Sequence, residues 1–490
     1  MRTFTDRALD LAQVQGASYA DIRVVRRLTQ HIAVKNGIVE ALADDESQGF
    51  GVRVVVDGAW GFASSSTLSP EQVDRITAQA VQIARASALF KTRDVRLGPP
   101  VTHTGTYRTP VQIDPWSVSL EDKIALLLQA NQGLRSTPGV RVASSTLSFW
   151  REDKTFANTD GAFLEQTKVE SGGGIEAIAV DRQRGEVQKR SFPNSFARDQ
   201  RSEGWEGILA MDLPANAPRI GEEAVALLSA DPCPSGVTTL ILGPTQLALQ
   251  IHESCGHPIE LDRVFGTEAS YAGTSFLTPE KYGTFRYGSD VVNLTADATL
   301  PGGLGTFGWD DEGVPAQRVP IVRQGIFCGY LTSRESAQQL REIVGEQAPD
   351  TSGGAMRADG WNRIPIIRMT NVNLEPGSWT FDDLVADTDD GIYMELNKSW
   401  SIDDKRLNFQ FGTEIAYEIK GGKMGRMLKN ATYTGMTPRF WGSCDAICDA
   451  AHWRVWGTPN CGKGQPGQTA HTGHGAAPAR FRSVQVGVLK

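Results

Sequence analysis

Residues 51–64 read GVRVVVDGAWGFAS and predict a β-hairpin. Alternating apolar residues flank the Asp-Gly pair at 57–58, and such a pair is a strong local signal for a tight hairpin turn. An earlier run, residues 21–34, ends at the Asn-Gly pair at 36–37 and predicts the beginning of another hairpin. The chain therefore starts with a sheet built from strands that are neighbours in sequence.

Helical patterns lie on both sides of these hairpins. A short helix carrying Leu9, Leu11 and Val14 is expected to end at Gly16. After the hairpins, Ser69 is the expected N-cap of a second helix, with proline at its first position. The apolar face of that helix consists of Val73, Ile76, Ala80 and Ile83. These elements predict an α+β domain over residues 1–95.

Residues 105–230 predict a second α+β domain. A helix capped at Ser119 is expected to stop at Gly133, and strands follow with Gly-containing turns near residues 160 and 185. Three glycines at 172–174 are expected to interrupt the strand pattern of residues 169–180. A helix near residues 221–229 then leads to a proline-rich boundary.

Residues 235–490 are richer in glycine and in strand patterns. A buried strand is expected over residues 237–242, and a helix opens after it at Pro244. A later hairpin is expected to join residues 409–419 to 424–433. The predicted fold class is α+β, with N-terminal mixed α/β sheet domains followed by a β-rich C-terminal domain.

Composition narrows the classes of function. The chain has 490 residues, 40% of them apolar, and 49 basic against 57 acidic side chains give a net charge of −8. This negative net charge argues against nucleic acid as a partner. No apolar run is long enough to span a membrane. Six cysteines are too few for a disulfide scaffold, and the N-terminus does not resemble a secretory signal. We therefore expect a reduced, cytoplasmic protein.

Residues 250–257 read QIHESCGH and carry the strongest chemical signal. The two histidines, His252 and His257, are five residues apart, which places them about 140° apart around an ideal α-helix. They reach one metal only if the helix widens into a π-turn or ends between them, and Gly256 makes such a distortion plausible. Glu253 beside the first histidine is placed to take a proton from a water that the metal activates. From spacing alone, the stretch is either a variant metal site or a coincidence.

A catalytic zinc site needs a third protein ligand, and the C-terminal region offers two sets of candidates. Cys444, Cys448 and His452 have a spacing that would align them on a helix, where core packing is the commoner role. Cys461 instead lies in a Gly- and Pro-rich stretch expected to form a loop, in which exposure or ligation is more typical. Two further histidines, His471 and His474, follow it and are either additional ligands or part of a solvated turn.

Two other features have less specific interpretations. The acidic run Asp310, Asp311 and Glu312 is expected mainly to be a solvated turn, with a structural or substrate-channel role as the alternative. The glycines between residues 302 and 308 are compatible with turns or with a strand edge that a substrate approaches, and residues 397–411 are another candidate for such an edge.

The order of several motifs resembles the TldD/PmbA family of metallopeptidases. The resemblance rests on the stretch from His252 to Arg263 and on the Cys461 region. It also includes the segments YAGTSF at 271–276, DDEGVP at 310–315 and RMTN at 368–371. These motifs match over roughly residues 235–480, and the segment GFGVRV at 49–54 resembles the family with a weaker motif.

That resemblance implies one Zn²⁺ per chain, with Fe²⁺ as an alternative, held by His252, His257 and Cys461. It assigns Glu253 as the general base and leaves the Cys444 series a structural role. Because this chain retains the metal motif, it resembles the catalytic member of the family, which implies a homodimer or a heterodimer with a related subunit. The continuation at residues 258–263 lacks the Gly-rich pattern of some members and suggests a different branch.

Three functions are compatible with these residues. The first is a zinc-dependent metallopeptidase that hydrolyses unfolded or short peptides. The second is a metal-dependent amidase acting on a peptide-like small molecule. The third is a non-catalytic peptide-binding subunit whose metal is structural, which a closed site with His471 or His474 as a fourth ligand would favour.

Overall fold

The computed structural model describes residues 1–270 and 273–487. Tyr271 and Ala272 of the YAGTSF motif, and residues 488–490 of the predicted C-terminal domain, lie outside the described residues. None of the helices in the described ranges is long and apolar enough to cross a membrane.

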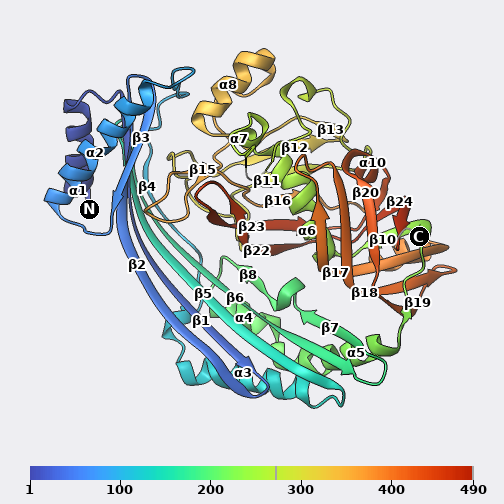
Figure 1. The fold of residues 1–490 in the computed structure, drawn as a ribbon. Coiled ribbons are helices and arrows are strands. Elements are labelled where there is room, and N and C mark those ends of the chain that lie inside the picture. The colour runs from blue at the N-terminus through green and yellow to red at the C-terminus, as the bar shows by residue number, and fades with distance from the viewer. Residues whose placement is uncertain (271–272, 488–490) are drawn as a thin grey trace.

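Eight strands of the described chain form one long, curved sheet, in which β7 and β8 both pair with β6 and the main order is β3-β2-β1-β5-β6-β4. The strands are β1 (Tyr19–Lys35), β2 (Ile38–Val56), β3 (Ala59–Ser65), β4 (Thr104–Arg108), β5 (Val140–Asn158), β6 (Phe163–Asp181), β7 (Glu186–Phe192) and β8 (Asp199–Arg201). Figure 1 shows this sheet curving around the C-terminal half of the molecule.

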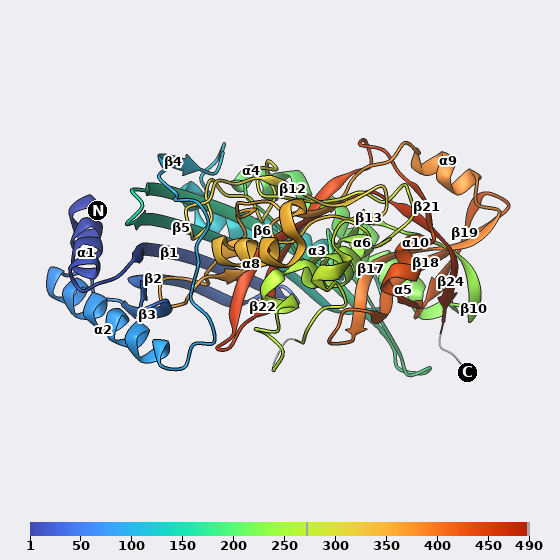
Figure 2. The same ribbon diagram turned by 90° about the horizontal axis from the view of Figure 1, so that it is seen from above.

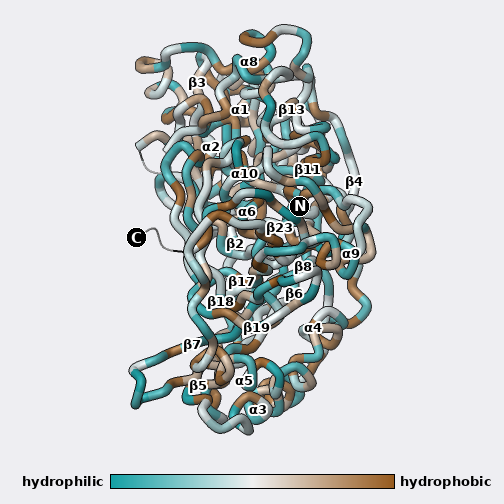
Figure 3. The backbone as a smooth tube through the Cα atoms, turned by 90° about the vertical axis from the view of Figure 1, so that its right-hand side faces the viewer, coloured by the Kyte–Doolittle hydropathy of each residue, from teal (hydrophilic) through white to brown (hydrophobic). Residues whose placement is uncertain are grey.

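Helices cover the outer face of the sheet in two groups. Near one end, α1 (Arg2–Val14) and α2 (Pro70–Ala88) enclose one apolar core. Near the other end, α3 (Leu120–Arg135), α4 (Trp205–Met211) and α5 (Leu213–Ser229) enclose a second. In Figure 3, apolar and polar segments alternate along the strands and helices, which is the pattern of elements with one buried side.

Most local predictions for this half are confirmed. Both hairpins form at the predicted turns, and the Ser69 side chain accepts a hydrogen bond from the Gln72 N–H as an N-cap. The apolar face of α2 was predicted too wide, because Ile83 is 39% exposed. Helix α3 continues past Gly133, which does not end it but brings it close to Ala217 of α5.

The glycines at 172–174 do not interrupt the strand, because β6 runs through them without a break. The same sheet contains strands from residues 1–95 and from residues 105–230, joined where β1 pairs with β5. The division of the chain into three domains stays a prediction.

A second sheet dominates the C-terminal half. Its order is β17-β10-β24-β20-β18-β19-β9, and β17 also pairs with β18, so that five of these strands form a closed ring. The strands are β9 (Asp231–Pro232), β10 (Gly236–Leu242), β17 (Asp390–Ile402), β18 (Asn408–Lys420), β19 (Lys423–Lys429), β20 (Thr432–Met436), β21 (Cys444–Ile447) and β24 (Ala479–Val486). Within residues 397–411, the β18 part pairs on both sides, with β17 and β20, whereas the β17 part lies beyond the residues that pair with β10 and pairs only with β18 among the described strands, so the strand edge expected there stays a prediction.

Smaller elements pack on this ring. A third sheet has the order β13-β12-β11-β16, and two further pairs are β14–β15 and β22–β23. Their bounds are β11 (Leu294–Asp297), β12 (Arg318–Arg323), β13 (Ile326–Phe327), β14 (Met356–Arg357), β15 (Ile366–Ile367), β16 (Val372–Leu374), β22 (Arg454–Lys463) and β23 (Gln468–Ala476). The helices are α6 (Pro244–Ile251), α7 (Leu261–Val264), α8 (Arg334–Val344), α9 (Phe381–Ala386) and α10 (Thr437–Gly442). The predicted α+β class with a β-rich C-terminal region is confirmed.

The acidic run joins the two halves of the molecule, so the interpretation as a solvated turn was wrong. Asp311 is buried and lies 2.5 Å from Lys154 Nζ and 3.5 Å from Arg23 Nη1, both on the curved sheet. Glu312 lies 3.5 Å from Arg53 of the same sheet. Figure 2 shows the C-terminal half lying along this sheet. The arginine within the apolar strand GVRVVV was the available signal, since a core-facing charge needs a partner.

The glycine-rich stretch at 302–308 forms turns and no strand. Gly305 packs against the backbone of Thr370, and its N–H donates to the Asn371 side chain. The RMTN motif therefore holds this stretch in place, which supports the interpretation of these glycines as turn residues.

Candidate metal centre

The two histidines of the central motif lie on the same side of a widened helical turn. Helix α6 continues into a π-helical turn over His252–Gly256, in which the His257 N–H donates to the His252 carbonyl. The two imidazole rings consequently lie 4.9 Å apart between centroids. This is the distortion that the five-residue spacing required.

Local residues favour this turn. A β-carbon on Gly256 would lie 2.1 Å from the Met369 sulfur, so glycine is needed for the turn to pack on the RMTN segment. The Ser254 hydroxyl donates to the Gln250 carbonyl within the turn and accepts from Trp441 Nε1. Pro258 follows the second histidine in a short 3-10 turn, His257–Ile259.

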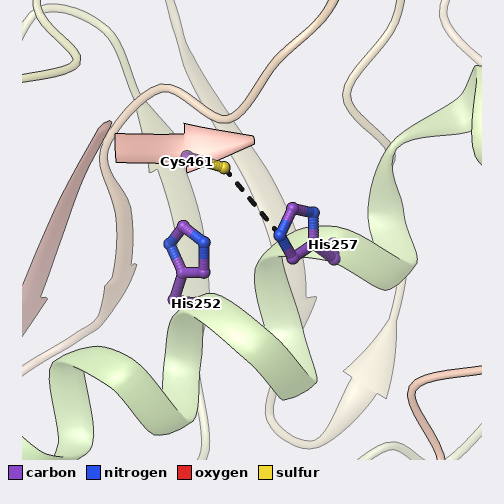
Figure 4. Close-up of side chains that lie close together, drawn as sticks. All are labelled: His252, His257 and Cys461. Atoms are coloured by element: carbon purple, nitrogen blue, oxygen red, sulfur yellow. Dashed lines mark hydrogen bonds between the residues drawn. The ribbon is translucent and has the colours of Figure 1, made fainter. Parts of the chain in front are cut away.

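Cys461 completes the cluster from a distant part of the sequence. One ligand atom from each of His252, His257 and Cys461 lies within 4.8 Å of the other two, and all three side chains are buried. Figure 4 shows the cysteine on its strand facing both rings, with Sγ 3.8 Å from His257 Nε2. The expected loop around Cys461 is instead strand β22, which has an irregularity between Thr458 and Cys461.

Two basic side chains fix the strand that carries Cys461. Lys463, two residues further along β22, is buried with its ammonium 2.6 Å from Asp262 and 3.5 Å from Glu260. Arg368 donates to the Cys461 carbonyl from the other side. The acidic residues after the second histidine thus hold the third candidate ligand near the first two.

Hydrogen bonds select the tautomer of each histidine. His474 Nδ1 lies 3.2 Å from the Val372 carbonyl, which can only accept, so its Nε2 is left to accept from His252 Nδ1–H at 2.8 Å. His257 Nδ1 lies 3.0 Å from the Glu260 carboxylate and donates to it. Both candidate ligands therefore present an unprotonated Nε2, as a metal requires.

The electrostatic environment favours the ligand forms of all three side chains. Burial lowers the pKa of both His252 and His257, which keeps the rings neutral. Burial opposes the Cys461 thiolate, but the hydrogen-bonding contact with His257 and the positive charge of Arg368 outweigh it and lower the pKa of this thiol. By contrast, burial raises the pKa of Cys255 to about 12, and its sulfur faces the Tyr287 hydroxyl in the core.

Glu253 lies in the same cavity and is paired with Arg406. Arg406 Nη1 donates to Glu253 Oε2 at 2.5 Å, and the Arg406 carbonyl accepts from the Thr437 hydroxyl. Arg406 belongs to the connection between β17 and β18 and has a left-handed backbone conformation with φ 63°. Sequence analysis missed this arginine, because it lies 153 residues from its partner.

A cavity of about 320 Å³ opens beside the cluster. Its lining includes His252, Glu253, His257, Cys461 and Arg406, together with residues of the segment between β7 and β8. A cluster of two nitrogens and one sulfur that opens to a cavity fits zinc in a catalytic role, which uses three protein ligands and keeps one position for water or substrate.

The other candidate ligands lie elsewhere. Cys444 and Cys448 lie on and just after the short strand β21 rather than on a helix, and His452 pairs with Asp449. His471 contacts Glu170 of the curved sheet at 2.5 Å. His474 lies on β23 and supports His252, so neither of the last two histidines lies in a solvated turn.

Comparison with known proteins places this chain in one class, the metallopeptidase families. The C-terminal domain of the PmbA/TldA metallopeptidase family matches residues 235–487, its domain 1 matches residues 20–84 and its central domain matches residues 113–230. The chain belongs to this family, which is the TldD/PmbA family that the motifs resemble.

Relatives with the name metalloprotease are similar over most of their length. A metalloprotease of Methanocaldococcus jannaschii is 28% identical over 85% of this chain and 86% of its own. A TldD homologue of Haemophilus influenzae is 25% identical over 98% and 94%. A protein of Saccharolobus solfataricus named zinc metalloprotease TldD homologue is 20% identical over 97% and 98%.

Solved structures share the whole fold. TldE from Thermococcus kodakarensis superposes with a TM-score of 0.73 at 17% identity, covering 99% of both chains. A Thermotoga maritima protein described as a candidate modulator of a DNA gyrase gives 0.76 at 19% identity, covering 99% of this chain and 100% of its own. At these identities the likeness establishes the fold alone.

Proposed function

We propose that this protein is a zinc-dependent metallopeptidase that hydrolyses peptide bonds of unfolded or short peptides. The observation that carries the proposal is the convergence of His252, His257 and Cys461 beside Glu253 at an open cavity. The metalloprotease names of the relatives support it, and one of those names specifies zinc. When bound, zinc would polarise the peptide carbonyl and acidify water.

The chain's own residues supply the remaining steps. The Glu253 side chain lines the cavity, Arg406 holds its Oε2, and no described group is hydrogen-bonded to the other oxygen, Oε1. Glu253 would take a proton from the attacking water at this oxygen and deliver it to the leaving amine. Glu260 and His474 keep the two imidazoles in the required orientation throughout.

Of the two alternatives, only the structural metal fits these residues less completely. A structural metal would need a closed set of ligands, whereas His474 contacts His252 and leaves the cavity side open. An amidase acting on a peptide-like small molecule would use the same three ligands and the same base. Hydrolysis of ordinary peptide substrates would distinguish a peptidase from such an amidase.

We further propose a cytoplasmic enzyme that works as a homodimer or as a heterodimer with a related subunit, and the shared fold of TldE supports the second arrangement. All six cysteines are free thiols, which fits a reducing compartment. The mass of the purified chain in solution, measured by light scattering, tests the first arrangement against the second.

The first experiment is hydrolysis of a mixture of unstructured peptides by the zinc-loaded chain, followed by mass spectrometry. Glu253→Gln should lower turnover by about 10²–10⁴-fold, because proton transfer is lost while the ligands remain. Its zinc content, measured by inorganic mass spectrometry, should equal that of the wild type. An active Glu253→Gln enzyme would contradict the assignment of the base.

A further inference from the structure

The segment between β7 and β8 brings an arginine of the curved sheet region to the metal cavity. Asn194, Ser195, Phe196 and Arg198 all line this cavity, although the candidate ligands lie in the C-terminal half. Sequence analysis assigned no role to this segment. Its placement requires an explanation, because it connects two strands of a different sheet.

Hydrogen bonds hold the segment on both sides of Arg198. Before it, the Ser195 hydroxyl accepts from the Asn397 N–H of β17 at 2.8 Å. After it, the buried Asp199 accepts from the Gly457 N–H at 2.9 Å and from Arg454 at 2.8 Å, both on the strand that carries Cys461. The arginine is therefore fixed relative to the proposed ligand strand.

Glycines on both neighbours make room for this segment. A β-carbon on Gly174 of β6 would lie 2.1 Å from the Ala197 carbonyl oxygen, and one on Gly457 of β22 would lie 1.8 Å from that of Gln200. Gly172 and Gly174, which do not break their strand, thus make room for the segment on the sheet, and Gly457 makes room for it on β22.

The backbone before Arg198 is strained. Phe196 and Ala197 are both left-handed, with φ 61° and 54°, and neither is glycine. Consecutive residues in this region persist only when their surroundings impose them, and they concentrate at functional sites. Here the conformation leads the chain directly into the cavity wall.

Arg198 has no hydrogen-bond or ion-pair partner among residues 1–270 and 273–487. Glu253 is the one carboxylate among the described residues that line the cavity, and Arg406 already occupies it. Burial without a compensating charge lowers the pKa of Arg198. Phe196 and Trp400, which also line the cavity, form an edge-to-face pair with ring centroids 5.8 Å apart. The cavity lining thus includes two aromatic rings and a half-buried arginine that is unpaired among the described residues.

We propose that Arg198 binds a carboxylate of the peptide substrate, so that the enzyme selects anionic peptides. The carboxylate is either the free C-terminus or an acidic side chain, since both match the planar guanidinium in geometry and charge. The proposal rests on the function proposed above, in that it assigns the ligand to the same cavity.

The test measures binding in the zinc-loaded Glu253→Gln protein, which does not depend on turnover. Four fluorescein-labelled alanine hexapeptides are compared by fluorescence anisotropy. Two differ only in a C-terminal carboxylate or carboxamide, and two carboxamide peptides differ only in one internal Glu or Gln. The same peptides are titrated into the Arg198→Gln/Glu253→Gln double variant. A control adds Arg426→Gln instead, an exposed arginine of β19 outside the cavity.

We expect one carboxylate peptide to bind about 10-fold or more tightly than its neutral partner, as a charged hydrogen bond predicts. Arg198→Gln should reduce that ratio to about 1, whereas Arg426→Gln should leave it unchanged. The pair of peptides whose affinities differ shows whether Arg198 binds the C-terminal carboxylate or the acidic side chain. Equal binding of all four peptides, absent binding, or a preference that survives Arg198→Gln would overturn the proposal.

Zinc content and thermal unfolding of each variant separate a binding defect from loss of the fold. If only the proposed peptidase function is wrong, the wild type will not hydrolyse the peptides, but its carboxylate-selective binding will persist. This result differs from the outcomes that would overturn the role of Arg198.

Discussion

Two buried polar clusters join distant parts of this chain, and their compositions differ in an instructive way. In the acidic run, Asp311 and Glu312 face Lys154, Arg23 and Arg53 of the curved sheet. In the metal cluster, two neutral imidazoles and a thiol face one another beside a cavity. The first cluster balances charge with charge, whereas the second gathers three electron-pair donors around one centre.

The difference shows how a structural polar cluster is distinguished from a chemical one. Buried charges are tolerated when opposite charges satisfy them, and such a set needs no additional ligand. Converging donors with their protons held away from the shared centre are satisfied only by a cation. We therefore expect substitutions in the first cluster to change stability and those in the second to change metal binding.

The largest expected effect is loss of zinc from Cys461→Ala. Two imidazoles without the thiolate leave too few ligands for a stable site. The matched control is Cys255→Ala, since this nearby thiol faces Tyr287 rather than the cluster. Zinc per chain, measured after dialysis, should fall to near zero in the first variant and stay near one in the second. A full zinc content in Cys461→Ala would remove the distinction between the clusters.

Asp311→Ala should lower the free energy of unfolding by about 3–5 kcal/mol, because it leaves Lys154 and Arg23 partly or wholly buried without their partner. The exposed pair Arg7–Asp74 provides the control, and Asp74→Ala should leave the free energy of unfolding nearly unchanged, because solvent screens this pair. Urea denaturation measures both values. Zinc content per folded molecule should not change in either variant, and a selective loss of zinc from Asp311→Ala would contradict the structural role.

His474→Leu should weaken zinc binding by about 10- to 100-fold, because His252 Nδ1–H loses its acceptor. His474→Asn retains an acceptor oxygen and should recover part of that affinity. Competition with a chelator measures the dissociation constants. Equal affinities in both variants would indicate that His474 only fills space.

The smallest predicted effect is a pH dependence of the acidic run. Burial opposes the charge of Asp311, but Lys154 and Arg23 outweigh it and lower its pKa to about 2. An unfolded aspartate titrates near pH 3.9. The carboxylate therefore contributes about 2–3 kcal/mol that is present above pH ~4 and is lost as the pH falls toward 2. The stability difference between wild type and Asp311→Asn should shrink over that interval in urea titrations.

Local sequence predicted the elements that short-range interactions specify. The turn pairs at 36–37 and 57–58, the Ser69 cap and the helix after Gly243 all form where expected, because backbone preference and capping act over a few residues. The predictions that a helix ends at Gly133 and that a strand is interrupted at residues 172–174 were wrong. There the glycines provide room for neighbouring segments, which no local pattern reveals.

The sequence by itself determined the hairpins, the need for a widened turn between His252 and His257, and the place of Glu253 beside the first histidine. Tertiary structure alone decided how Cys461, 204 residues after His257, reaches the cluster. It also decided the tautomers, the pairing of Glu253 with Arg406, and the burial of the acidic run. The physical reason is range: turns and caps depend on adjacent backbone groups, whereas converging ligands and buried charges depend on packing between segments that are far apart in the chain.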